Sequence, residues 1–123
     1  MEFSKLATVD RHEHGARCPI LDPAGNKTDV LIKVKGADCA AWREHKNRQA
    51  LAMLNAKGEE DIDFEQMNID ALVAVTVDWT GIAENKKPYE YSEENARALY
   101  TKAPDVVRQL LEFLGKDENF PGG

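Results

Sequence analysis

A chain of 123 residues with 42% hydrophobic residues has the size and composition of one globular domain, and its formal net charge of −6 argues against a nucleic-acid partner. The longest apolar run, residues 71–77, is far shorter than the roughly 20 residues that cross a bilayer, so no membrane partner is expected. Because Glu2 follows Met1 and no apolar block comes after it, the chain does not begin like a secretory signal, and we expect a cytoplasmic protein.

Residues 1–35 are predicted to be a strand region that forms a small antiparallel sheet. β-branched residues occupy every second position from Val30 to Val34, which is the period of a strand. A shorter extended piece at 17–21 contains Pro19, which has no N–H and suits a sheet edge. The Pro, Gly and Asn residues of the segment 22–27 are typical of a turn, so the two strands are predicted to pair as a hairpin. Residues 6–9 are a candidate for a further strand.

Residues 38–115 are predicted to be a helical region. Asp38 is a candidate N-cap for a helix from Cys39 to about Lys57, which Gly58 would close. The residues of this helix that fall near one face are Cys39, Trp42, Ala50, Met53 and Leu54, and charged residues occupy the opposite side, so we expect a half-exposed helix.

A second long helix is predicted to begin at residues 63–66. The β-branched run at 71–77 also fits a strand by propensity. We favour a helix because the apolar residues continue at helical spacing through Trp79 to Ile82, where Gly81 ends the segment.

Two shorter helices are predicted to follow. Ser92 is the candidate N-cap of the first, and Pro104 suits the first turn of the second. Residues 116–123 are predicted to be a flexible tail. The predicted fold is therefore a single α+β domain, residues 1–123, with a small N-terminal antiparallel sheet followed by about four helices.

The sequence contains no motif that is typical of an enzyme. It has neither a Gly-x-Ser-x-Gly nucleophile motif nor a glycine-rich phosphate loop, and Cys18 and Cys39 are expected to be buried thiols. His12 and His14, with Cys18, have the residue types of a zinc site, but structural zinc normally takes four ligands and a second pair is missing. We therefore predict no catalytic residue, no cofactor and no metal; a small zinc-binding regulatory domain remains an alternative.

Aromatic residues in the second half of the chain are candidates for protein binding, because aromatic side chains are favoured as interface anchors. The candidates are Trp79, Tyr89, Tyr91 and Phe120. Trp79 lies on a predicted helical stripe, where a core position is the more common role. Tyr89, Tyr91 and Phe120 lie in predicted turns or in the tail, so we expect them to be partly exposed.

The order of short motifs in this half of the chain resembles a known family. Trp79-Thr80-Gly81-Ile82 is followed by a Pro88 turn and by Tyr91-Ser92-Glu93-Glu94-Asn95-Ala96-Arg97, and the Pro104 helix leads to Asn119-Phe120. This order is similar to that of the small tail assembly chaperones of long-tailed bacteriophages and prophages. His12-x-His14 and the polar first helix have no place in the family pattern.

The resemblance implies a non-enzymatic protein that binds the tape measure protein and keeps it soluble until the tail tube subunits polymerise around it. Contacts with the tail tube protein are also implied. The chaperone would act in the bacterial host cytoplasm and would be absent from the mature virion. The alternative is a minor or tail-completion structural protein that stays in the virion. No oligomeric state is predicted.

Overall fold

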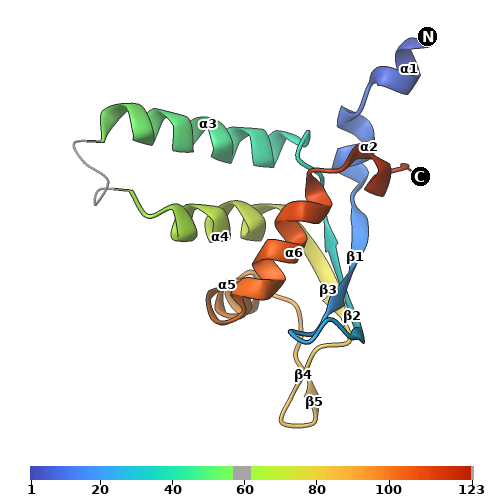
Figure 1. Ribbon diagram of the computed structural model, residues 1–123, viewed down its shortest axis with the longest axis vertical. Helices are drawn as coiled ribbons and strands as arrows, with labels where there is room; N and C mark the ends of the chain where they lie inside the picture. The colour runs from blue at the N-terminus through green and yellow to red at the C-terminus, as the bar shows by residue number, and fades with distance from the viewer. Residues whose placement is uncertain (57–61, 123) are drawn as a thin grey trace.

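The computed structural model describes residues 1–56 and 62–122 as an α+β fold with a three-stranded sheet and a two-stranded ribbon (Figure 1). In chain order the elements are α1 (Phe3–Leu6), α2 (Val9–His14), β1 (Ala16–Leu21), β2 (Lys27–Val34), α3 (Ala40–Asn55), α4 (Phe64–Val75), β3 (Thr76–Thr80), β4 (Ala83–Glu84), β5 (Lys87–Pro88), α5 (Glu93–Lys102), α6 (Pro104–Leu114) and the 3-10 turn η2 (Asp117–Asn119). The predicted fold class is confirmed.

The main sheet is antiparallel with the strand order β1-β2-β3. Its first two strands form the predicted hairpin, and Pro19 lies on the edge strand β1, where its missing N–H costs no ladder bond. Cys18, Ile32 and Trp79 pair across the three strands and are all buried, which identifies the face that the helices α4 to α6 cover.

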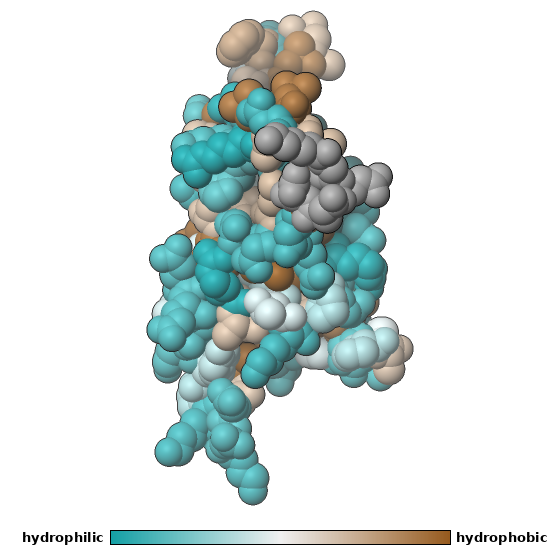
Figure 2. All heavy atoms as spheres, turned by 90° about the vertical axis from the view of Figure 1, so that its left-hand side faces the viewer, coloured by the Kyte–Doolittle hydropathy of each residue, from teal (hydrophilic) through white to brown (hydrophobic). Residues whose placement is uncertain are grey.

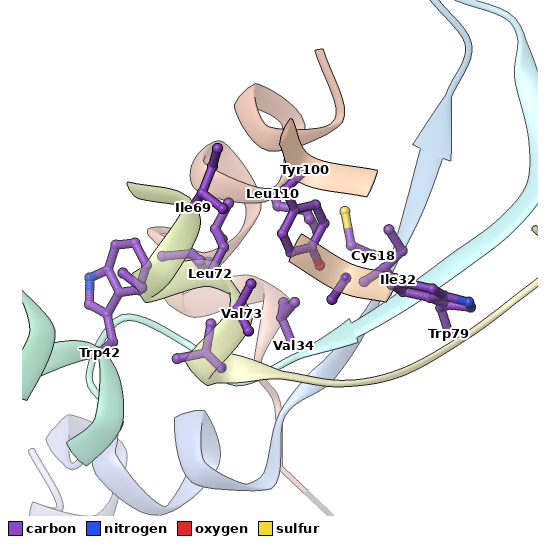
Figure 3. Packing of buried hydrophobic residues seen from close by; sticks show 14 of the residues in the cluster. Cys18, Ile32, Val34, Trp42, Ile69, Leu72, Val73, Trp79, Tyr100 and Leu110 are labelled. Atoms are coloured by element: carbon purple, nitrogen blue, oxygen red, sulfur yellow. The ribbon is translucent and has the colours of Figure 1, made fainter. Parts of the chain in front are cut away.

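One hydrophobic core joins the sheet to the helices. Its members come from β1, β2, α3, α4, β3, α5, α6 and the C-terminal segment (Figure 3). In Figure 3 the side chains of Leu72, Val73 and Ile69 from α4 lie between Trp42 on one side and Val34 and Tyr100 on the other. The single predicted domain stays a prediction.

The segment from α4 into β3 changes from helix to strand, so the prediction of one helix through Ile82 is wrong after Val75. Thr76 has an extended backbone, and its Oγ1 donates a hydrogen bond of 2.7 Å to the Leu72 carbonyl in the last turn of α4. The chain then pairs with the open edge of β2. The first part of the β-branched run is therefore helix and the second part is strand. The position of β2 decides where the helix ends and the strand begins.

The N-terminal residues were predicted as strand but form helices. Leu6 ends α1 and Val9 begins α2, so the candidate strand at residues 6–9 is wrong, and six α-helices are present in the described chain instead of about four. Helix α2 is held by tertiary contacts: Glu13 accepts a 2.8 Å hydrogen bond from the first backbone N–H of α3, at Ala40, and pairs with Lys35. A local sequence pattern does not contain these partners.

The predicted starts of two helices are confirmed, and the predicted cap of a third helix is wrong. Ser92 accepts a hydrogen bond of 3.0 Å from the Asn95 N–H, and Pro104 occupies the first turn of α6. The cap of α3 is Cys39 and not Asp38: the Cys39 Sγ accepts from the Trp42 N–H at 3.4 Å. The predicted closure of this helix at Gly58 lies outside the described residues.

Candidate functional site

The candidate aromatic residues of the second half of the chain form a packed group around β3. The Trp79 ring stacks on Tyr89 with centroids 6.0 Å apart and meets the edge of Tyr91 at 5.2 Å. The Trp79 Nε1–H donates to the Tyr89 carbonyl at 2.7 Å, and the Tyr91 hydroxyl donates to the Thr76 carbonyl at 2.9 Å. The structure thus brings three of the four predicted binding residues together.

This aromatic group has little free surface. Trp79 is buried, whereas Tyr89 and Tyr91 are half-buried. Burial, together with the nearby carboxylates of Glu93 and Asp78, raises the pKa of the Tyr91 phenol. Only the two tyrosines offer surface to a partner, and their protein-binding role stays a prediction.

Gly81 explains why the aromatic-x-Gly motif has a glycine. Its φ is +86°, and a Cβ at this position would lie 2.1 Å from the Asp29 carbonyl oxygen of β2. A side chain would therefore meet both a strained backbone conformation and a backbone clash. The motif sets the exit of β3 from the sheet and contributes no reactive group.

Phe120 is completely buried, so its predicted partial exposure is wrong. The predicted flexibility of residues 116–123 stays a prediction. The Phe120 ring stacks on His12 with centroids 4.7 Å apart and meets Phe113 at 5.4 Å. The Asn119 side chain donates to the Phe113 carbonyl at 2.9 Å. Asn119 and Phe120 therefore hold the C-terminal segment against the core. Because Phe120 is completely buried, its side chain has no surface with which to bind a partner.

His12, His14 and Cys18 do not form a metal site. His12 is buried, and its Nδ1 accepts a 2.9 Å hydrogen bond from the Asp38 N–H, so the proton lies on Nε2, which donates to Asp117 at 3.0 Å. In the described part of the chain, the His, Cys and carboxylate group with metal-compatible spacing is His12, Asp38 and Asp117. Because both ring nitrogens of His12 already have protein partners, the geometry is that of a structural histidine.

The two cysteines are buried and free, as predicted. Burial raises the pKa of the Cys18 thiol to about 11, and burial is also the main reason why the pKa of Cys39 is raised. A nucleophilic cysteine needs a lowered pKa, so neither thiol has the environment of a catalytic group.

A groove of about 490 Å³ lies between the β1–β2 hairpin and α6. Three of its charged residues pair with each other, since Arg108 binds both Asp105 and Glu112. The side-chain amide of Gln109 accepts from the Leu21 N–H at 2.8 Å and donates to the Leu21 carbonyl at 2.9 Å, which occupies the end of the β1 edge. The lining of this groove is both polar and apolar, and Gln109 joins its two sides.

The apolar surface lies elsewhere, at the distal half of the α3–α4 hairpin. Leu54 is 82% exposed, Leu51 is 59% exposed, and Met53 and Phe64 are also exposed. In Figure 2, which looks onto the hairpin side, apolar atoms gather in the upper part of the molecule and the lower part is mostly hydrophilic. A second exposed apolar group, Met1, Phe3 and Leu6, belongs to the N-terminal segment.

The sequence pattern did not reveal this surface, because Met53 and Leu54 were placed on the same helix face as Trp42. The side of α3 that is buried or half-buried instead carries Ala41, Trp42, His45, Gln49 and Ala52. A finer count of the helical period gives part of the signal, because Leu51 lies on the side opposite Trp42 and Leu54 lies about a third of a turn away from it. Met53 lies on the same side as Trp42 and is exposed nevertheless.

Comparison of the chain with protein-family models, with curated proteins and with solved structures finds no match. Among the helices in residues 1–56 and 62–122, none has the length and apolar character needed to span a membrane. The surfaces of the molecule are therefore the basis for a functional proposal.

Proposed function

We propose that this protein is a non-enzymatic tail assembly chaperone of a long-tailed bacteriophage or prophage. It binds the tape measure protein in the host cytoplasm and keeps it soluble until the tail tube subunits polymerise around it. It also contacts the tail tube protein and is left out of the mature virion.

The observation that carries the proposal is the exposed apolar surface of the α3–α4 hairpin. Large apolar side chains that are more than half exposed, such as Leu51 and Leu54, occur on a protein whose core is otherwise complete. Contiguous exposed apolar groups are typical of protein-binding surfaces. A long helical chain with apolar stripes aggregates in water, and a small domain with such a surface can cover these stripes reversibly.

Two further features support it. The motif residues that resemble the family build the frame of the fold: Trp79 and Gly81 fix the exit of β3, and Phe120 closes the core. The net charge of −6 opposes self-association of a protein that carries exposed apolar groups.

Co-expression tests the proposal. We expect the tape measure protein of the same phage to be recovered in the soluble fraction when this protein is co-expressed, and in the pellet when it is replaced by an unrelated acidic protein of similar size. Equal solubility in both cases contradicts the proposal. Mass spectrometry of purified virions separates the alternative, because a chaperone is absent from the particle and a tail-completion protein is present at fixed stoichiometry.

A further inference from the structure

The two halves of the α3–α4 hairpin are packed differently. At its base, Trp42 of α3 and Ile69 of α4 are buried, and the side chains of α4 continue into the core (Figure 3). In the distal half, residues 47–56 and 62–67, both helices continue but no residue is buried. The half-buried residues of this part are Gln49, Ala52, Ala56, Ile62 and Met67. The distal half therefore lacks the buried apolar face that normally holds a helix in a tertiary structure.

Polar groups add little to hold the two helices together beyond the base. In the described residues, the one side-chain hydrogen bond from α3 to α4 joins Lys46 Nζ to Asn68 Oδ1 at 3.5 Å, at the border between the two halves. Gln49 lies about two turns after Trp42, on the side of α3 that faces α4, and its buried Nε2 atom has no hydrogen-bond partner. A buried donor without a partner destabilises the closed hairpin, because the same group binds water when the hairpin opens.

From this contrast we infer that the distal half of the hairpin opens as a unit while the base of the hairpin and the sheet stay folded. Opening breaks only the contacts of half-buried residues, whereas opening the base would expose Trp42, Ile69 and Leu72 to water. The closed form predominates, and urea changes its population only slightly because opening exposes little surface. The exposed side chains Leu51 and Leu54 are thus carried on a part of the chain that changes shape without unfolding the core. The inference does not depend on the proposed function.

Hydrogen–deuterium exchange of the backbone amides, followed by mass spectrometry, tests the inference on the wild type. We expect the amides of residues 51–55, at the end of α3, to exchange at least about 100-fold faster than those of residues 110–114, at the end of α6, which include two buried leucines. Low concentrations of urea are expected to accelerate exchange in residues 71–75 of α4 and to leave residues 51–55 unchanged. Equal protection of the two helix ends, or the same dependence on urea in both parts of the hairpin, overturns the inference.

Two leucine variants of α3 separate the opening of a unit from fraying of one helix end. Gln49→Leu removes the unpartnered donor and adds an apolar contact with α4, so we expect exchange to slow about tenfold in residues 51–55 and also in residues 67–69 of α4. Asn47→Leu is the matched control at an exposed position and is expected to change both rates by less than about twofold. Slowing that is confined to α3, or slowing of equal size in both variants, overturns the inference. The wild-type comparison decides the question if Gln49→Leu does not fold.

Discussion

At the level of single residues, the fold depends on a buried histidine with two different partners. His12 accepts from the Asp38 N–H and donates to Asp117, and its ring stacks on Phe120. These contacts join α2, the loop before α3 and the C-terminal segment, which are far apart in the sequence. The backbone of Gly36 lies against His12: its N–H donates to the His12 carbonyl at 3.0 Å, and the imidazole ring occupies the space where a Cβ of residue 36 would stand.

Gly36→Ala is expected to destabilise the protein by about 1–3 kcal/mol, because a Cβ at this position would lie 2.1 Å from His12 Nδ1. The φ of Gly36 is not in the left-handed region, so the cost is steric. Urea denaturation measures the change in the free energy of unfolding.

Gly115→Ala is the matched control. Gly115 also lacks a positive φ, and the nearest atom to its added Cβ is 3.7 Å away, which is an ordinary contact. This variant is expected to be as stable as the wild type or slightly more stable. Equal effects of the two substitutions would show that the close approach of Gly36 to the His12 ring does not require a glycine.

At the level of elements, the C-terminal segment is part of the core. Turn η2 places Phe120 against His12 and Phe113, and the Asn119 side chain fixes the turn on the end of α6. A hydrophobic pattern could not predict that this segment packs against the core, because Phe120 is the one residue of the segment whose ring makes the contact.

Phe120→Ala is expected to lower the free energy of unfolding by about 3–5 kcal/mol, since it removes a completely buried ring and leaves a cavity. The control is the neighbouring exposed residue: Pro121→Ala is expected to change the stability by less than about 0.5 kcal/mol. Thermal and urea denaturation of the two variants give the comparison. A wild-type stability for Phe120→Ala shows that the segment is not part of the core.

At the level of the whole molecule, one core spans residues from β1 to the C-terminal segment, and the two tryptophans report on different parts of it. Trp42 lies at the base of the α3–α4 hairpin, with the Lys46 ammonium group 4.8 Å from its ring centroid. Trp79 lies on β3 and donates to the Tyr89 carbonyl. The distance between these probes along the chain allows a test of the predicted single domain.

We expect the protein to unfold in one cooperative transition. In each of the variants Trp42→Phe and Trp79→Phe, the remaining tryptophan fluorescence and the far-ultraviolet circular dichroism are expected to give the same urea midpoint. The comparison is made within each variant, so it does not depend on how much each substitution destabilises. Different midpoints for the two probes in either variant indicate that the hairpin and the sheet unfold separately.

Elements whose signals are local follow from the sequence alone. The turn chemistry at residues 22–27 predicts the β1–β2 hairpin, and Ser92 and Pro104 mark the starts of α5 and α6. Each of these features depends on a few neighbouring residues, so the pattern was sufficient. The class of fold follows from the same signals.

Features that depend on distant partners emerge only when the chain is folded. The change from α4 to β3 occurs at Thr76 because the free edge of β2 lies beside it, and α2 forms because Glu13 and His12 bind the loop and the start of α3. Phe120 enters the core because His12, about a hundred residues earlier, provides a surface for it. Burial is a property of the assembled chain, which is why the aromatic residues Trp79 and Phe120 of the motifs are buried and the apolar side chains of Leu51 and Leu54 are exposed.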